Sequence, residues 1–300
     1  MDLVRGTLDE HGYTVLTPDG WTRAERLPLV LVLHGANSSA DALVMMQPII
    51  ESSDLPRTLV ACVSTPTAGG FYLGRWERLV AEEFPAHLVT EFNAGPIALL
   101  GSSMGGYGAL RIAFADPGRF TAVAAISPAL LTADPRPRNT LSVLGQFAAE
   151  MRPQDTIFSR LRANAGAVRD SGLPILLRCG DRDVFALHDG AERLHRELWD
   201  LDIAHDYHLV RDADHLGPEA VDSLGAAFAF VAAAQRAASR DRGLDEAWLA
   251  WEASGRRGDP PRFDAFGPSA PTALRVMMAG ELAEAARLDP DVSRRYGRLS

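Results

Sequence analysis

Apolar residues in the first two thirds of the chain follow two alternating spacings. Runs of about four to eight mostly apolar, β-branched-rich residues predict strands, and longer segments with helical periodicity lie between them. The expected strands are residues 13–17, 29–34, 59–64, 96–102, 122–127, 175–179 and 205–210. The expected helices are residues 40–51, 75–92, 106–116, 190–200 and 218–236.

This alternation predicts an α/β fold in which a mostly parallel central sheet carries helices on both faces. Several of the strand runs are apolar almost throughout, as in strands that are covered on both sides. Residues 130–171 are longer than an ordinary crossover and contain Pro135, Pro137 and Pro153. We therefore expect a cap-like insertion above the sheet at about 130–171.

The pattern changes after residue 236. Residues 237–254 and 273–288 have helical periodicity, and the stretch between them is rich in proline, glycine and charge. We expect two parts, an α/β domain over residues 1–236 and a helical C-terminal extension over 237–300. An apolar stripe that includes Met277 and Met278 is expected to pack on the parent domain, with a contribution to a homodimer as the alternative.

Charge and composition narrow the class of protein. The net charge is −9, and no long block of like charges is present, which argues against nucleic acid and anionic membranes as partners. The apolar runs are far shorter than the roughly 20 residues that span a bilayer. Because the first residues lack the pattern of a secretory signal, we expect a cytoplasmic protein without a membrane segment.

Two residue types exclude several chemistries. All 30 basic residues are arginine, so a Schiff-base lysine, a phosphate-binding loop lysine and a Ser-Lys dyad are ruled out. Cys62 and Cys179 lie in apolar strand-like runs, where buried thiols are expected instead of a disulfide or metal ligands. No metal-binding cluster and no dinucleotide-binding G-x-G-x-x-G motif is found, so no cofactor is expected.

A G-x-S-x-G motif supplies the strongest chemical signal. It runs from Gly101 to Gly105, after an apolar strand and before a helix, which is the context that a nucleophile elbow requires. Small residues let the strained turn, the strand and the helix approach closely. Ser103 is the candidate nucleophile, and the N–H of Met104 is the candidate oxyanion donor.

A serine nucleophile needs a histidine base and a carboxylate that orients it. In this arrangement the acid and then the histidine follow later strands. His215 lies in a polar loop after the last expected strand. Asp183 and Asp181 both follow the strand at 175–179; the spacing favours Asp183, and the assignment stays open between the two.

The second oxyanion donor is expected in an early loop. Residues 31–37 end an apolar strand with His34 and Gly35, and the N–H of Ala36 is the candidate donor. His34 itself is expected to have a structural role.

Together these motifs resemble an α/β-hydrolase, in particular the branch of esterase D, antigen 85 and the feruloyl esterases. Residues 103–109 read Ser-Met-Gly-Gly-Tyr-Gly-Ala, which is similar to the nucleophile elbow of that branch, and residues 71–85 are similar to its preceding segment. The resemblance covers roughly residues 25–235. It differs in the context of His215, which is Asp-His-Leu and not Gly-His-x-Trp.

The expected reaction is cleavage of a carboxylic ester or thioester of a small acyl substrate through an acyl-enzyme. An acyltransferase or cyclase with the same triad, a peptidase and a non-catalytic binding protein are the alternatives. Substrate selection is expected in residues 66–76 and 130–171. Pocket candidates are Phe71, Tyr72 and Trp76, with Phe147 and Met151 in the insertion, and each has core packing as its alternative role.

Overall fold

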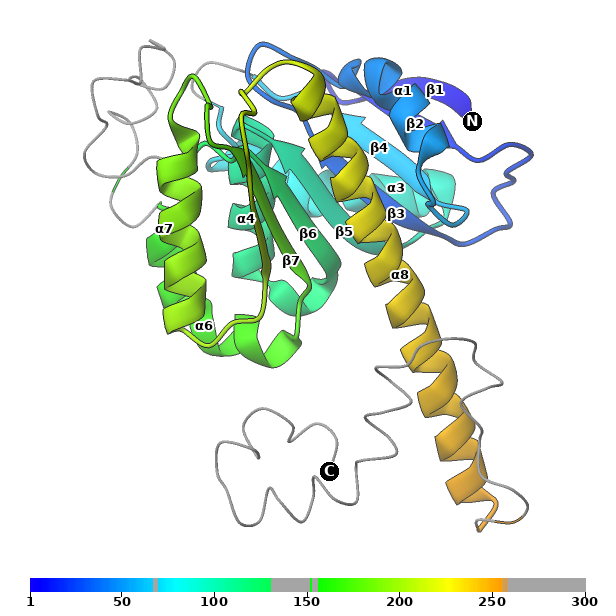
Figure 1. The fold of residues 1–300 in the computed structure, drawn as a ribbon. Helices are drawn as coiled ribbons and strands as arrows, with labels where there is room; N and C mark the ends of the chain where they lie inside the picture. The colour runs from blue at the N-terminus through cyan, green and yellow to red at the C-terminus, as the bar shows by residue number, and fades with distance from the viewer. Residues whose placement is uncertain (67–69, 131–151, 153–155, 256, 258–300) are drawn as a thin grey trace, which may run out of the picture. The chain divides into compact units, whose positions relative to one another are not determined.

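The computed structural model describes residues 1–66, 70–130, 152, 156–255 and 257 (Figure 1). In this part of the chain, eight strands form one sheet in the order β1-β2-β4-β3-β5-β6-β7-β8. From β4 to β8 neighbouring strands run parallel, whereas β2 is antiparallel to β1 and to β4. The strands are β1 (Asp2–Leu8), β2 (His11–Thr17), β3 (Leu27–Leu33), β4 (Leu59–Val63), β5 (Ala94–Ser102), β6 (Phe120–Ile126), β7 (Ile175–Gly180) and β8 (Asp206–Val210). The predicted mostly parallel α/β sheet is confirmed.

Helices cover both faces of the sheet. The described helices are α1 (Ala42–Ser52), α2 (Arg75–Arg78), the π-helical η1 (Leu79–Glu83), α3 (Phe84–Phe92), α4 (Met104–Ala115), the short 3₁₀ helix η2 (Pro117–Arg119), α6 (Ile157–Ser171), α7 (Leu187–Asp200) and α8 (Pro218–Ala253). Helix α1 and residues 218–235 of α8 contribute to the core on one face. Helices α3, α4, α6 and α7 contribute to the core on the other.

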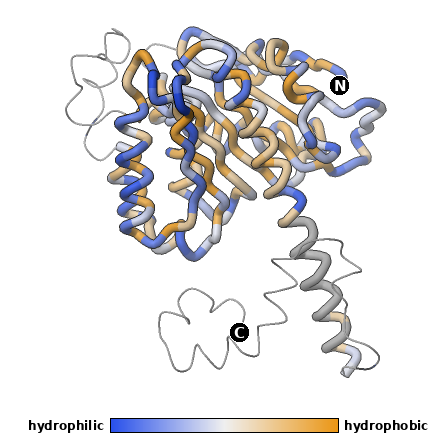
Figure 2. The backbone as a smooth tube through the Cα atoms, in the orientation of Figure 1, coloured by the Kyte–Doolittle hydropathy of each residue, from blue (hydrophilic) through white to orange (hydrophobic). Residues whose placement is uncertain are grey.

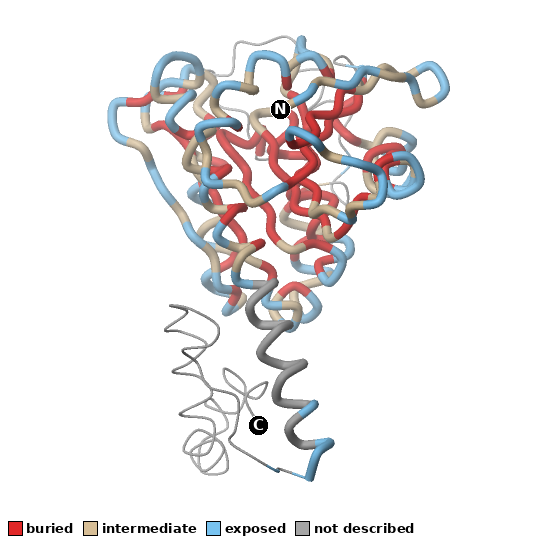
Figure 3. Tube along the Cα trace, turned by 90° about the vertical axis from the view of Figure 1, so that its right-hand side faces the viewer, coloured by how far each residue is buried: buried red, intermediate tan, exposed pale blue. Residues whose placement is uncertain are grey.

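Strand β3 shows why these strands are apolar throughout. Its side chains alternate between the faces, so Leu29 and Leu31 enter one core while Val30 and Val32 enter the other. All four are fully or almost fully buried. Figure 2 shows hydrophobic residues along the strands, and Figure 3 shows the same region as the buried centre of the sheet.

Strand β1 was not among the predicted strands. It forms a hairpin with β2 in which Leu8 pairs with His11, and Asp9 in the turn has a positive φ of 51°. Strand β1 lies at the edge of the sheet, and all its residues are exposed or half-buried. Its sequence therefore lacks the apolar run that identifies a buried strand.

The described end of the predicted insertion is a crossover helix. Helix α6 connects β6 to β7, packs against α4 and buries Leu161 and Val168 in the core. The Thr156 hydroxyl caps its first turn by accepting the N–H of Ser159 at 3.1 Å. The rest of the predicted insertion, with Phe147 and Met151, lies outside the described residues.

The chain divides into two compact units, Met1–Gln235 and Arg236–Ser300. Helix α8 is continuous from Pro218 to Ala253, where the sequence predicted separate helices at 218–236 and 237–254. The predicted stripe around Met277 and Met278 lies outside the described residues. Within the described ranges, no helix combines the length and the apolar character that a membrane span requires.

Candidate active site

Three of the predicted site residues follow neighbouring parallel strands at the same edge of the sheet. Ser103 follows β5, Asp183 lies in the loop after β7 and His215 lies in the loop after β8. These strands are close neighbours in the order β5-β6-β7-β8. The carboxyl ends of parallel strands meet at one edge, where α/β proteins bind their ligands.

Ser103 occupies a strained turn. Its φ of 56° and ψ of −118° are unusual for a residue with a side chain, and such a conformation costs on the order of 1–3 kcal/mol. Backbone hydrogen bonds hold it: the Ser103 N–H donates to Ile126 O at 2.9 Å, and its carbonyl accepts from Ala129 N at 3.0 Å. The turn thus projects the hydroxyl from the start of α4.

Glycine is required at the start of α4 because the helix lies directly on the sheet. A Cβ at Gly105 would lie 1.9 Å from the carbonyl oxygen of Leu33 in β3, and one at Gly101 would lie 2.1 Å from the Gly105 carbonyl oxygen. Both neighbours are backbone atoms that cannot move aside cheaply. The two outer glycines of the motif therefore set how closely the Ser103 turn approaches β3.

Two backbone N–H groups near the turn have no protein acceptor among the described residues. Gly35 adjoins Ser103, since a Cβ at Gly35 would lie 3.8 Å from the Ser103 Cβ. In residues 1–66 and 70–130, the N–H groups of Ala36 and Met104 donate to no protein acceptor. The N-terminus of α4 adds the positive end of its dipole to the same position.

The loop that carries Ala36 is held by buried hydrogen bonds. The Tyr72 hydroxyl donates to His34 O at 2.9 Å, and the Thr65 N–H donates to His34 Nε2 at 3.0 Å. Because the Gly35 carbonyl oxygen only accepts, His34 Nδ1 must donate to it, at 2.8 Å. Burial lowers the pKa of His34, so the ring is neutral. His34 thus has the structural role expected from its place before Gly35.

The structure brings Asp183 and His215 into direct contact. His215 Nδ1 lies 2.7 Å from Asp183 Oδ2, with the His215 side chain 8% exposed and that of Asp183 0% exposed. The other oxygen, Asp183 Oδ1, accepts the Phe185 N–H at 2.9 Å. A carboxylate beside Nδ1 fixes the tautomer in which Nε2 can accept a proton.

Asp181 and Asp214 do not occupy this position. Asp181 lies on the same loop as Asp183, but its cationic partner is Arg182, whose Nε lies 4.0 Å from Asp181 Oδ1. Asp214 Oδ1 accepts the backbone N–H of Val184 at 2.8 Å and that of His215 at 2.6 Å. The sequence identified Asp214 only as a loop residue, because no local pattern reveals a contact to residue 184.

Ser103 is not hydrogen-bonded to the pair formed by Asp183 and His215 among the described contacts. No hydrogen bond joins Ser103 Oγ to His215 in the part of the chain that the structure describes.

The two cysteines are buried, and burial raises the pKa of each thiol to about 12. Both thiols are therefore protonated and unreactive at neutral pH.

The aromatic pocket candidates have other contacts. Tyr72 is fully buried and supports the His34 carbonyl, and Phe71 is 2% exposed with its ring edge-on to Tyr107. Trp76 packs against the core and lies under the guanidinium of Arg75, whose Cζ is 4.3 Å from the ring centre. These contacts fit the core-packing alternative for the three side chains.

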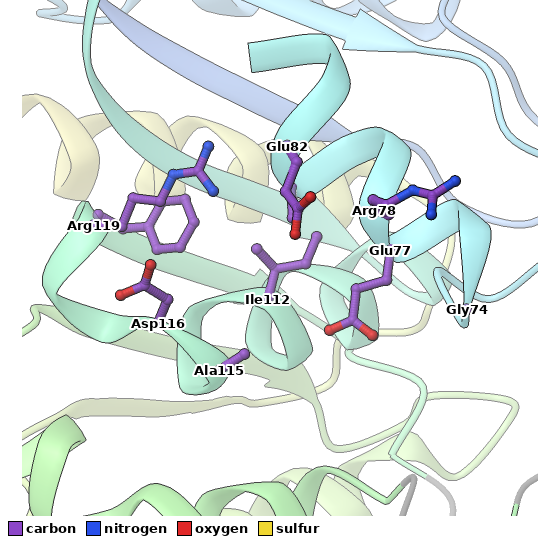
Figure 4. Close-up of a pocket in the computed structure, with 10 residues that line it drawn as sticks. Gly74, Glu77, Arg78, Glu82, Ile112, Ala115, Asp116 and Arg119 are labelled. Carbon is purple, nitrogen blue, oxygen red and sulfur yellow. The ribbon is translucent and has the colours of Figure 1, made fainter. Parts of the chain in front are cut away.

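A cavity of about 300 Å³ lies elsewhere, between η1 and α4 (Figure 4). Its charged lining includes Glu82, Asp116 and Arg119. Phe120, the first residue of β6, also lines it, which places it near the amino ends of the strands. It is therefore remote from the edge that carries Ser103.

Among the described residues, no group of three metal-ligating side chains is present.

Comparisons with known proteins agree with this architecture. The model of the Esterase family, described as "Putative esterase", matches residues 8–198, which include Ser103 and Asp183 and end before His215. No curated protein sequence matches the chain.

Solved structures share the fold at low sequence identity. A ferulic acid esterase matches with a TM-score of 0.64 at 18% identity, covering 78% of this chain and 98% of its own. An S-formylglutathione hydrolase from Staphylococcus aureus matches with a TM-score of 0.61 at 13% identity, covering 76% and 97%. The siderophore hydrolase EstA from Aspergillus nidulans matches with a TM-score of 0.55 at 15% identity, covering 77% and 91%. The architecture is that of an α/β-hydrolase.

Proposed function

Because this chain belongs to the Esterase family and is a carboxylic ester hydrolase, we propose that it cleaves its substrate by nucleophilic catalysis with Ser103, His215 and Asp183. The substrate is a small carboxylic ester or thioester. The observation that carries this assignment is the 2.7 Å contact between His215 Nδ1 and the buried Asp183, at the sheet edge where Ser103 follows β5.

The first half of the reaction forms an acyl-enzyme. Ser103 Oγ attacks the substrate carbonyl carbon while His215 Nε2 takes the hydroxyl proton. The negative charge that develops on the carbonyl oxygen is stabilised by the N–H groups of Ala36 and Met104. When the tetrahedral intermediate collapses, the bond to the leaving alcohol or thiol breaks, and His215 returns the proton to that leaving group.

The second half repeats these steps with water. His215 Nε2 takes a proton from water, the resulting oxygen attacks the acyl carbon, and Ser103 leaves with the proton that His215 returns. Asp183 stays ionised and stabilises the imidazolium that forms twice in each cycle. The hydrogen bond between Ser103 Oγ and His215 Nε2 forms when substrate is bound, since catalytic hydrogen bonds are often completed only in the complex.

The test is reaction with a fluorophosphonate probe, followed by intact mass spectrometry and peptide mapping. We expect one adduct at Ser103 and turnover of short p-nitrophenyl esters, with both lost in Ser103→Ala. A folded wild-type protein without an adduct at Ser103 would overturn the proposal. Labelling with turnover only when an alcohol or amine acceptor is added would instead indicate an acyltransferase.

A further inference from the structure

Asp214 connects the two loops that carry Asp183 and His215. One of its oxygens, Oδ1, accepts two backbone N–H groups, that of Val184, 30 residues earlier in the chain, and that of the adjacent His215. Val184 directly follows Asp183, and Asp214 directly precedes His215. The carboxylate therefore fixes the backbone next to both partners of the 2.7 Å contact between His215 and Asp183.

Backbone contacts also join the two loops where they leave strands β7 and β8. The Arg182 N–H donates to Ala213 O at 2.9 Å, and a Cβ at Gly180 would lie 2.2 Å from that oxygen. These contacts lie at the ends of β7 and β8, before Asp183 and His215 in the two loops. Asp214 adds a further contact between the two loops, because its Oδ1 accepts the N–H of Val184.

The His215 ring has two neighbours on the loop that Asp214 holds. Asp183 lies at Nδ1, and the Phe185 ring stands edge-on at a centroid distance of 4.7 Å and an interplanar angle of 75°. Val184, whose N–H donates to Asp214, lies between Asp183 and Phe185. A shift of this backbone relative to His215 would displace both ring contacts together.

We propose that Asp214 is a positioning residue, whose carboxylate aligns the Asp183 loop with His215 and so sets the direction of His215 Nε2 toward Ser103. This inference rests on the proposed function for its effect on catalysis. Hydrogen bonds to an ionised acceptor are stronger than neutral ones. The bond from the Val184 N–H joins the Asp183 loop to Asp214, and the bond from the His215 N–H orients the Asp214 carboxylate within its own loop. Small misplacements of a catalytic group cost about 100-fold in rate.

The Asp214 carboxylate is ionised at neutral pH, as a strong hydrogen-bond acceptor for the two loops should be. The N–H groups of His215 and Val184 lower the pKa of Asp214, so the carboxylate is charged at neutral pH. The side chain is exposed, and its bonds are made at the protein surface. Its removal should therefore change the alignment of the site more than the stability of the fold.

The experiment compares Asp214→Ala, Asp214→Asn and Asp212→Ala. Asp212 is the matched control, since it lies on the same loop and carries the same charge, and its recorded ion pairs are with the exposed Arg182 and Arg211. We expect Asp214→Ala to lower kcat about 10- to 100-fold with KM nearly unchanged, and to lower the rate of fluorophosphonate labelling in parallel. Asp214→Asn keeps an oxygen acceptor and should recover most of the loss, and Asp212→Ala should behave as wild type.

A second measurement does not depend on activity. The proton between His215 Nδ1 and Asp183 should give a low-field ¹H NMR signal, identified by its absence in His215→Gln. We expect this signal to be lost or broadened in Asp214→Ala and retained in Asp214→Asn and Asp212→Ala. The urea unfolding midpoint of Asp214→Ala should stay close to that of the wild type.

The outcomes separate this inference from the proposed function. If the wild type is not labelled at Ser103, the proposed function fails, and the low-field signal still decides whether Asp214 aligns the loops. If the wild type is labelled but Asp214→Ala matches Asp212→Ala in kcat and in the signal, the positioning role is overturned. A loss of kcat equal in Asp214→Ala and Asp214→Asn, with the signal retained in both, would also overturn it.

Discussion

The hydroxyl of Tyr72 donates a hydrogen bond of 2.9 Å to the backbone carbonyl of His34, and both residues are buried. The carbonyl belongs to the loop that carries the N–H of Ala36. Tyr72→Phe keeps the ring and leaves this buried acceptor without its donor, which costs about 1–3 kcal/mol. We expect lower stability in urea unfolding and about a tenfold lower kcat, because the loop is less well fixed.

Tyr13→Phe is the control for that variant. The Tyr13 hydroxyl makes no hydrogen bond within the described chain, while its ring packs against Phe84. It should therefore unfold like wild type and keep its kcat. Equal effects of the two substitutions would refute the supporting role of the Tyr72 hydroxyl.

Asp183 and Asp181 should differ sharply in their effect on turnover. Asp183→Asn removes the charge that stabilises the His215 imidazolium and permits the wrong tautomer, so we expect kcat to fall about 10³- to 10⁴-fold. Asp181→Asn changes a residue without contact to His215 and should leave kcat close to wild type. Steady-state kinetics on a p-nitrophenyl ester measures both, and the reverse order of effects would move the acid role to Asp181.

Gly105→Ala should weaken the fold at the Ser103 turn. The new methyl group would meet the Leu33 carbonyl oxygen at 1.9 Å, and overpacking of this kind costs about 1–3 kcal/mol. Gly166→Ala is the matched control, because nothing lies within 4 Å of its Cβ position in α6. That control should gain about 0.5–1 kcal/mol from its better helix propensity. Urea unfolding of both variants measures the difference, and equal stabilities would contradict the close approach of α4 to β3.

Stability should fall in mild acid partly through His34. Burial lowers its folded pKa below the unfolded value near 6.5. Between these two values the unfolded chain binds more protons, so stability decreases as the pH drops below about 6.5 through the folded pKa. Above that window His34 contributes no pH dependence.

The measurement is urea unfolding of wild type and His34→Gln at several values between about pH 5 and 8. Because His34→Gln cannot be protonated, its stability should decline less steeply below about pH 6.5. Other titrating groups are common to both proteins and cancel in the difference. Parallel curves for the two proteins would show that His34 is not kept neutral by burial.

The sequence by itself determined the class of fold and the local chemistry of the nucleophile turn. Alternating strand and helix periodicities predicted the parallel sheet, because a strand such as β3 must be apolar on both faces when helices cover both. The motif around Ser103 was visible because its glycines are needed within a few residues of each other. Strand β1 escaped prediction since its residues are all exposed or half-buried and form no continuous apolar run.

Only the tertiary structure decided which distant residues meet. Asp181 and Asp183 look alike in the sequence, and the turn after β7 places Asp183 against His215. The contacts of Asp214 with Val184 and of Tyr72 with His34 left no local signal either. Each joins segments about 30 to 40 residues apart, and such pairings follow from the order of strands in the sheet and the path of the loops between them. The periodicity of apolar residues predicts whether a residue is buried, but it does not predict which distant residue it contacts.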